Sequence, residues 1–418
     1  MKTFLLGTAD GIWTAEDSRC ERIALEGERV TTLAASPEPG ALYAVTAGGR
    51  IYKSRDGGNQ WEKQFEARPG ERFMSLAVSP HPPYPVYAGT WPADVFRAPD
   101  GERWERVETF RKTEGSKYWC FPPPPHDPRL VSFAFHPEDS DILYATVEMG
   151  GVMKSRDGGE SWKPMTDDVN RDTHVVIMHP DDPDTLYVST GFASSYRPGV
   201  YWTRDGGESW EYRYRDMHPM YTWRMCIDPV WPEVLHVVAY PYAPGDWHVP
   251  TGTGGDLLRT EDGGETWTHP HRGVHLPTVN YLPKIMPDPE APGGVLGAHP
   301  HRPFGHPSVP FYHLGDSTFL SAPVFRCGGG VDGAGGSRAD GGMVAAVSRH
   351  RYVLRGHASG EPASLGTPNR PEGAEPPISV DEGVAERELR DRILSAPSGI
   401  GRWLTAVAAT VACVALAV

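Results

Sequence analysis

The sequence predicts an all-β fold made of repeated four-stranded antiparallel sheets, on three observations. The first is an octapeptide of the form Ser/Thr-x-Asp-Gly-Gly-x-x-Trp, which occurs at 54–61, 155–162, 203–210 and 260–267. The second is an apolar segment that ends in a proline, and the third is a short segment containing Leu-Tyr or Val-Tyr. The three features recur in the same order about every 50 residues, which indicates that one structural unit is repeated along the chain.

The octapeptide has the composition of a tight hairpin turn. Its Asp carboxylate can accept hydrogen bonds from N–H groups of its own turn, and its glycines supply positive φ angles. Its Trp falls on the next strand, where it can cover the seam to a neighbouring sheet. A shorter fifth copy lies at 98–104. Equivalent carboxylates repeated around one scaffold are expected to be structural rather than catalytic. The aspartates concerned are Asp56, Asp100, Asp157, Asp205 and Asp262.

The complete repeat is strand, Pro turn, strand, loop, strand, Asp turn, strand. The apolar strands that end in a Pro turn are 33–37, 76–80, 133–137, 176–180 and 225–229. The strands that follow them include 42–45, 86–89, 143–146 and 186–189. Four strands joined by short turns form an antiparallel sheet of the kind that makes one blade of a β-propeller.

These repeats resemble those of the BNR-repeat, or Asp-box, β-propellers of the sialidase-like superfamily, related to other WD40/YVTN/BNR-like repeats. That group includes sialidases, xyloglucan-degrading glucanases, sortilin-type receptors and photosystem II assembly factors. The resemblance covers about residues 1–298 and implies a single β-propeller. It says less about activity, because the same propeller serves enzymes and binding proteins alike.

The first strands indicate how the ring closes. Segments 4–8 and 11–13 match the second and third strands of later repeats, so the chain begins inside a blade. Such a ring must close with strands from its C-terminal part, which removes two free sheet edges. Segment 281–287 fits an innermost strand and 294–298 the strand after it. We predict seven blades, with six as the alternative.

Charge and cysteine content exclude several classes of protein. The formal net charge of −14 argues against nucleic-acid binding, which needs a basic surface. The five cysteines are scattered, so neither a disulfide framework nor a zinc site follows from them. The apolar run at the start is too short for a signal peptide, and a cytoplasmic protein is the expectation. We predict no cofactor.

The C-terminal third has a different composition. Residues 299–400 are rich in Gly, Pro, Ala, Ser and Arg, and they predict a disordered tail with one short helix at 380–394. A reading-frame slip in the last blade is the alternative. The uncharged segment 403–418, within the apolar end 401–418, would be about 24 Å long as a helix, short of a hydrocarbon core of about 30 Å. We expect a spurious or merely apolar end here, with a C-terminal membrane anchor as the alternative; membrane contact would be made only through this segment.

Long loops point to the functional face. Strand order places the Asp turns and Pro turns on one face of the ring, and the segments 110–129, 191–198 and 240–255 on the other. Loops of this length in a compact repeat are usually functional. Their aromatic and charged residues suit stacking on a sugar or a partner peptide, which we expect to bind there. The residues are Trp119, Tyr196, Arg197, Asp246 and Trp247.

One position of the innermost strands stands out. Five residues before the proline, most repeats have a small residue, but Arg224 occupies this place beside Trp223. We predict that Arg224 binds an anion or a carbonyl group at the mouth of the central channel; pairing with a neighbouring carboxylate is the alternative. Other side chains expected at this mouth are Trp91, Asp94, Glu148, Asp172, His174 and Tyr221. A lone His such as His174 is more often structural, and no spacing selects a metal.

Two functions remain open. The favoured hypothesis is a non-catalytic propeller that binds a protein or small ligand at this mouth. The alternative is a glycoside hydrolase, which needs two carboxylates about 5–9 Å apart, to be found among Asp94, Glu148, Asp172 and Asp246. The resemblance to sialidases is incomplete, because their Arg-Ile/Leu-Pro tripeptide has only Arg22-Ile23-Ala24 as its nearest match. The resemblance to the xyloglucan-degrading enzymes is also incomplete, because those enzymes have two propellers that face each other and this chain has room for one.

Overall fold

The computed structural model describes most of residues 3–298 and three later segments. The described ranges are 3–16, 19–122, 124–165, 168–193, 196–213, 220–243, 255–269, 284–288, 291–298, 308–314, 324–326 and 345–348. The chain divides into two compact units, Met1–Arg349 and His350–Val418. All described residues belong to the first unit, so the predicted helix at 380–394 and the apolar segment 401–418 lie outside them.

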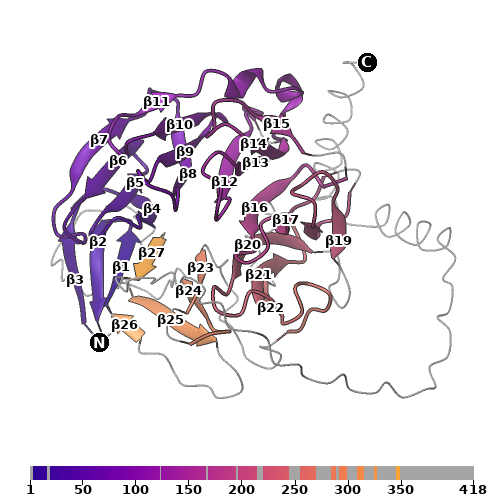
Figure 1. Cartoon of the computed structure of the whole chain (residues 1–418). Coiled ribbons are helices and arrows are strands. Elements are labelled where there is room, and N and C mark those ends of the chain that lie inside the picture. Colours follow the sequence, from indigo (N-terminus) through magenta and orange to yellow (C-terminus); the bar gives the residue numbers. More distant parts are fainter. Residues whose placement is uncertain are drawn as a thin grey trace, which may run out of the picture. The chain divides into compact units, whose positions relative to one another are not determined.

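The described part of the chain is all-β and its strands pair into seven antiparallel sheets (Figure 1). The first sheet contains β27 (Ala345–Ser348), β1 (Thr3–Thr8), β2 (Gly11–Glu16) and β3 (Arg19–Ala24). The second contains β4 (Val30–Ala35), β5 (Leu42–Thr46), β6 (Arg50–Ser54) and β7 (Glu62–Glu66). The third contains β8 (Arg72–Val78), β9 (Val86–Trp91), β10 (Val95–Ala98) and β11 (Glu105–Arg106).

The remaining four sheets repeat this order. The fourth contains β12 (Arg129–Phe135), β13 (Leu143–Glu148), β14 (Gly151–Ser155) and β15 (Lys163–Pro164). The fifth contains β16 (Thr173–Met178), β17 (Leu186–Thr190), β18 (Gly199–Thr203) and β19 (Glu211–Arg213). The sixth contains β20 (Tyr221–Ile227), β21 (Leu235–Tyr240) and β22 (Asp256–Thr260), and the seventh β23 (Lys284–Pro287), β24 (Val295–Ala298), β25 (Ser308–Leu314) and β26 (Val324–Arg326). Two 3-10 helices, η1 (Phe110–Lys112) and η2 (Ser116–Tyr118), lie between β11 and β12.

The sheets of this unit follow one another around a central axis, as the blades of a β-propeller do. The innermost strands contact in the order β27, β4, β8, β12, β16, β20 and β23. On the outside, β26 of the seventh sheet contacts β3 of the first. The predicted fold class, an all-β propeller of four-stranded antiparallel sheets, is therefore confirmed. The number of blades stays a prediction, because long segments between the strands of the last sheets lie outside the described residues.

The C-terminal strands differ from the prediction that the propeller ends at 298 and a disordered tail follows. The structure places β25, β26 and β27 within 299–400, and β27 pairs with β1 as the innermost strand of the first sheet. The expected closure of the ring by a C-terminal strand thus uses a segment well beyond 298. The sequence did not reveal these strands because neither an Asp turn nor a Pro turn separates them.

The core consists of apolar side chains packed between neighbouring sheets. Tyr87 and Val95 of the third sheet pack with Leu130, Leu143 and other residues of the fourth. The second strands lie in the middle of this packing, and every residue of β13, β17 and β21 is buried. Strands covered on both faces need apolar residues in succession rather than in alternation, which explains their Leu-Tyr and Val-rich sequences.

Each Asp turn is held by its own hydrogen bonds. In the turn that contains Asp157, the Ser155 hydroxyl donates to Asp157 Oδ1 at 2.8 Å and accepts from the Gly159 N–H at 2.8 Å. Asp157 Oδ1 also accepts from the Ser161 N–H at 2.9 Å, and Gly159 has a φ of +85°. The turns of Asp56, Asp205 and Asp262 have the same hydroxyl-to-carboxylate bond. The carboxylates stabilise the turns, as predicted from the sequence.

The Asp turns also join neighbouring sheets. In three of the sheets, a tyrosine of the second strand donates its hydroxyl to a glycine carbonyl in the Asp turn of the next sheet. The pairs are Tyr43 with Gly101 at 3.1 Å, Tyr87 with Gly158 at 2.9 Å and Tyr144 with Gly206 at 2.8 Å. These bonds are buried or partly buried, where a lost hydrogen bond costs more than at the surface. The turns therefore stabilise the ring.

The Asp turns make stability dependent on pH in the acid range. Burial alone would raise the pKa of Asp205, but hydrogen bonds from the Ser209 and Thr203 hydroxyls and from backbone N–H groups outweigh it and lower the pKa to about 2. A carboxyl whose folded-state pKa is depressed stabilises the fold above its unfolded-state pKa of about 3.9 and loses this effect as the pH falls toward the folded value.

We therefore expect urea unfolding midpoints to fall between about pH 4 and pH 2, and to fall less steeply in Asp205→Asn. The Asn variant keeps the size of the side chain but cannot titrate. The exposed Asp181→Asn serves as the matched control, and its profile should follow that of the unmodified chain. An unchanged slope in Asp205→Asn would contradict the assignment of this carboxylate to turn stabilisation.

Candidate functional site

The face of the ring opposite the Asp turns carries the polar groups that form the candidate site. We call it the loop face: it holds the starts of the innermost strands and the connections from each second strand to the third. The opposite turn face carries the Asp turns and Pro turns. Arg129 begins β12, Glu148 ends β13, and Asp172 directly precedes β16, so these three residues lie on the loop face.

A β-bulge near the start of β12, β16 and β20 directs side chains at this site. The register shifts by one residue between Leu130 and Ser132 in β12, and bulges recur between Thr173 and Val176 in β16 and between Thr222 and Met225 in β20. A bulge inserts one unpaired residue and redirects the neighbouring side chains. In β16 and β20 the bulged segments contain His174 and Trp223. The local fold therefore presents these rings side by side, with centroids 4.7 Å apart.

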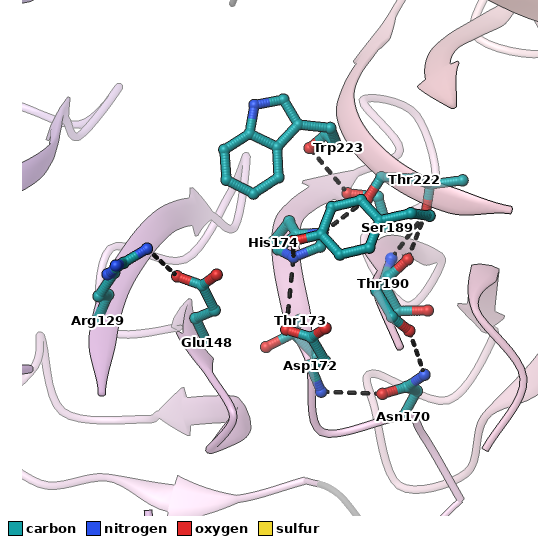
Figure 2. A network of polar contacts seen from close by, with 12 residues as sticks. Arg129, Glu148, Asn170, Asp172, Thr173, His174, Ser189, Thr190, Thr222 and Trp223 are labelled. Atoms are coloured by element: carbon teal, nitrogen blue, oxygen red, sulfur yellow. Dashed lines mark hydrogen bonds and ion pairs between the residues drawn. The ribbon is translucent and has the colours of Figure 1, made fainter. Parts of the chain in front are cut away.

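Three ionisable side chains converge here, from two neighbouring sheets (Figure 2). One ligand-capable atom each of Glu148, Asp172 and His174 lies within 4.8 Å of the other two. Asp172 Oδ1 is 3.5 Å from His174 Nε2. An isolated β-bridge between Glu148 and Asp172 fixes the distance between their backbones. We call Glu148, Asp172 and His174, together with Tyr221, the central cluster; all four side chains are buried.

Hydrogen bonds orient the His174 ring. Its Nδ1 lies 2.6 Å from the Thr222 carbonyl oxygen, and its Nε2 lies 2.9 Å from the Tyr221 hydroxyl. A carbonyl oxygen only accepts, so Nδ1 carries a hydrogen, and in the neutral ring Nε2 accepts from Tyr221. This assignment follows from the hydrogen-bond network. Burial, followed by the charges of Asp172 and Glu148, raises the pKa of Tyr221 well above its usual value, so its hydroxyl keeps its proton.

The pKa of the Glu148 carboxyl is subject to opposing effects. Burial raises the pKa of its carboxyl, the charge of His174 lowers it, Asp172 raises it and Arg129 lowers it; the net shift is upward. Arg129 Nη1 donates to Glu148 Oε2 at 3.3 Å, while the second carboxyl oxygen faces His174 in Figure 2. This carboxyl therefore keeps its proton up to a higher pH than an exposed glutamate does.

Asn170 fixes the loop that borders the cluster. Its side-chain oxygen accepts from the Asp172 N–H at 2.9 Å, and its amide nitrogen donates to the Gly191 carbonyl at 2.8 Å and the Arg197 carbonyl at 3.2 Å. Gly191 lies so close that a Cβ there would be 2.1 Å from Asp172 Oδ2 and 2.5 Å from Tyr221 Cε2. The position therefore admits no side chain while the cluster keeps its arrangement.

A cavity of about 590 Å³ lies on the same face, over the second and third sheets. Trp91 is part of its lining, together with Arg72 and Pro92. Arg72 lies over one side of the Trp91 ring at 5.3 Å, and Arg129 lies 4.9 Å from the ring centroid. Because Arg129 also pairs with Glu148, contacts run without interruption from the cavity to the central cluster and on to Trp223.

The structure brings together five of the predicted site residues and places four more beside them. Glu148, Asp172, His174, Tyr221 and Trp223 form one group, and Arg224 lies over the Trp223 ring at 4.8 Å. Trp91 joins this group through Arg129, and Tyr196 and Arg197 lie on the loop held by Asn170.

Asp94 and Trp119 have other partners. Asp94 is buried and pairs with Arg106 at 2.6 Å and Arg111 at 2.9 Å, which makes it part of a separate ion-pair network. Trp119 packs on Phe110, with ring centroids 5.5 Å apart. Asp246 and Trp247 lie outside the described residues.

Arg129, Asn170 and Thr222 belong to the site but were not predicted from the sequence. The signal for Arg129 was weak: it starts an innermost strand directly after a proline, at the end of the long loop. Asn170 stands two residues before a candidate carboxylate, a spacing that suits a side-chain bond to that residue's N–H. Thr222 contributes its carbonyl oxygen to His174, and no residue type reveals such a backbone contact.

Comparisons with known proteins agree with the fold. A Niastella koreensis GH74 enzyme matches with a TM-score of 0.54 and 18% identity over 71% of this chain and 49% of that structure. The GH74 xyloglucanase of Xanthomonas campestris matches with a TM-score of 0.54 and 15% identity over 77% of this chain and 52% of that structure. The chain thus spans about half the length of these two structures. Identities this low show the propeller fold alone.

One curated protein is similar in sequence over a shorter stretch. It comes from Neosartorya fischeri, is named a probable oligoxyloglucan-reducing end-specific xyloglucanase, and is 26% identical over 146 residues. The match covers 34% of this chain and 17% of that protein. No protein-family model matches the chain. Among the described residues, no helix is long and apolar enough to span a membrane.

Proposed function

We propose that this propeller binds a hydroxyl-rich ligand, such as an oligosaccharide, on its loop face. The observation that carries the proposal is the continuous series of contacts from Trp91 through Arg129 and Glu148 to His174 and Trp223. It combines half-buried aromatic rings with buried carboxylates and a guanidinium group. Rings that stack on apolar sugar faces, beside charged groups that bind hydroxyls, are the chemistry that an oligosaccharide requires.

Two N–H groups beside the cavity support this ligand class. Trp91 Nε1 and Arg129 Nε are buried and have no hydrogen-bond partner among the described residues. An unsatisfied buried donor costs free energy, so each such group suggests an acceptor supplied from outside the chain. Sugar hydroxyls, and the waters that accompany them, are acceptors of this kind. The cavity of about 590 Å³ falls within the range of small-ligand sites.

The names of two similar proteins make xyloglucan the first ligand to test. The protein similar in sequence is named a xyloglucanase, as is one of the solved structures with the same fold. We therefore propose xyloglucan oligosaccharides as the ligand. Binding of a partner protein at the same mouth, the other ligand expected from the sequence, is not part of this proposal.

Calorimetric titration with xyloglucan oligosaccharides tests the proposal. We expect binding to the unmodified chain, and a loss of about 10-fold or more in affinity in Trp91→Ala and in Trp223→Ala, because each removes a ring from the ligand path. The matched control is Trp231→Ala, which removes a half-exposed tryptophan from the turn face. Absence of binding, or an equal loss in the control, would refute this function.

Glycoside hydrolysis is a second candidate, favoured by the distance between two carboxylates. Glu148 and Asp172 have oxygens within 4.8 Å, near the separation of about 5 Å found in retaining glycosidases. The same titration samples reveal turnover if shortened oligosaccharides accumulate. If Glu148→Gln still binds the oligosaccharide but no longer produces shortened oligosaccharides, the unmodified chain is catalytic. If the unmodified chain leaves the oligosaccharide intact after prolonged incubation, binding without hydrolysis is its function.

A further inference from the structure

We propose that Glu148, Asp172 and His174 form a binding site for one divalent transition-metal ion. This inference goes beyond oligosaccharide binding and does not depend on it. Its basis is the arrangement of three side chains that could each supply one ligand atom, with these atoms within 4.8 Å of one another. The three residues come from two neighbouring sheets, and their spacing in the sequence matches no motif that selects a metal.

The distances suit coordination after a small contraction. Zinc binds imidazole nitrogen and carboxylate oxygen at about 2.0–2.2 Å, so two ligands of a tetrahedral ion lie about 3.4 Å apart. Asp172 Oδ1 and His174 Nε2 are already 3.5 Å apart. Glu148 would have to move by up to about 1.4 Å, the difference between the 4.8 Å limit and a spacing of about 3.4 Å.

The hydrogen bond from His174 Nδ1 to the Thr222 carbonyl oxygen is of the kind that metal-binding histidines make. Such a ring almost always donates its other N–H to a carbonyl or carboxylate, which fixes the tautomer and directs the lone pair at the ion. Nδ1 donates to the Thr222 carbonyl oxygen at 2.6 Å, which leaves Nε2 for the metal. The Tyr221 hydroxyl contacts Nε2 in the structure and would give up this bond when the ion binds.

The buried carboxylates lack donors in the direction of the proposed ion. Among the described residues, Arg129 is the hydrogen-bond donor to Glu148, through Oε2, and no donor reaches Oε1. Asp172 Oδ1 faces Nε2, which is itself an acceptor in the neutral ring. Both carboxylates are more than nine-tenths buried. Acceptors that face one another in a buried space require a positive charge between them.

Either a metal ion or a proton held within the central cluster could meet this requirement. The ligand set of one imidazole and two carboxylates suits Zn²⁺ or Mn²⁺. Ca²⁺ fits less well, because it takes six to eight oxygen ligands. Three protein ligands would leave one position open toward the loop face, where a water or a ligand hydroxyl could bind.

Calorimetric titration of the chelator-treated full chain with Zn²⁺, and separately with Mn²⁺, tests the proposal. We expect one ion per chain for at least one metal, and affinity reduced at least 10-fold in each of Glu148→Gln, Asp172→Asn and His174→Gln. Tyr221→Phe should bind as tightly or more tightly, because it removes the hydroxyl that competes for Nε2. The matched control is His179→Gln on the turn face, which should leave the affinity unchanged.

The possible results separate the two sources of charge. Stoichiometric binding that depends on the three ligands but not on His179 supports the metal site. Absence of binding by both metals overturns it and leaves a proton within the central cluster as the remaining source of charge. Equal binding in all variants would also overturn it, since the ion would then lie elsewhere. The urea unfolding midpoint of each ligand variant, compared with that of the unmodified chain, separates loss of folding from loss of a metal ligand.

Discussion

Replacement of Tyr144 by alanine is expected to lower the free energy of unfolding by about 3–5 kcal/mol, the range for large aromatic truncations in a core. Tyr144 is 1% exposed and packs between the fourth and fifth sheets. Its hydroxyl donates to the Gly206 carbonyl of the next Asp turn at 2.8 Å. The substitution thus removes both the packing and the polar link between two sheets. Urea unfolding followed by tryptophan fluorescence measures the change.

The conservative variant Tyr144→Phe separates the two contributions. It should cost about 1 kcal/mol, the typical value of one net hydrogen bond, because Lys154 still donates to the Gly206 carbonyl at 2.7 Å. Tyr118→Phe, at a side chain that is 52% exposed, is the matched control and should be neutral. If Tyr144→Phe were as neutral as this control, the Asp turns would not join the sheets in the way described.

Gly191→Ala is expected to disrupt the central cluster and to weaken ligand and metal binding about 100-fold or more. A Cβ at this position would lie 2.1 Å from Asp172 Oδ2 and 2.5 Å from Tyr221 Cε2, closer than atoms can approach. The loop cannot simply move away, because Asn170 holds it through the Gly191 carbonyl. The carboxylate and the tyrosine ring must shift instead, and overpacking of this kind costs about 1–3 kcal/mol of stability. The same titrations measure the loss of affinity.

Gly48→Ala is the matched control for stability and metal binding, but not for oligosaccharide binding, because Gly48 lines the cavity. Gly48 also lies on the loop face, and a Cβ there would meet the end of the flexible Arg50 side chain at 3.3 Å. Stability and metal binding should therefore remain close to those of the unmodified chain. If Gly191→Ala retained full affinity, the central cluster would not be part of the binding site.

The turns and strands were largely predictable because their signals are local. An Asp-Gly-Gly run needs a particular backbone geometry wherever it occurs, so four copies reveal a repeat without any knowledge of tertiary contacts. Strands β25, β26 and β27 lack such turns, and their places in the sheets depend on pairing with distant strands. For this reason the predicted boundary at 298 came too early.

The site was predictable only in part. Strand order placed Glu148, Asp172 and His174 on the loop face, because that face follows from the repeat. Their convergence could not be predicted, since it depends on the bulge in β16 and on the Glu148–Asp172 bridge. Asp94 stands at the corresponding loop of another sheet, yet pairs with Arg106 and Arg111. Sequence position gave the face of each residue and could not give its partner.

The central claim is that the loop face binds the ligand while the Asp turns stabilise the ring. Fluorine NMR of the chain labelled with 5-fluorotryptophan reports both faces in one sample, with signals assigned by single Trp substitutions. Addition of xyloglucan oligosaccharide should shift the signals of Trp91 and Trp223 and leave those of Trp61, Trp162 and Trp210 beside the Asp turns unchanged. Shifts confined to the Asp-turn tryptophans would contradict the claim.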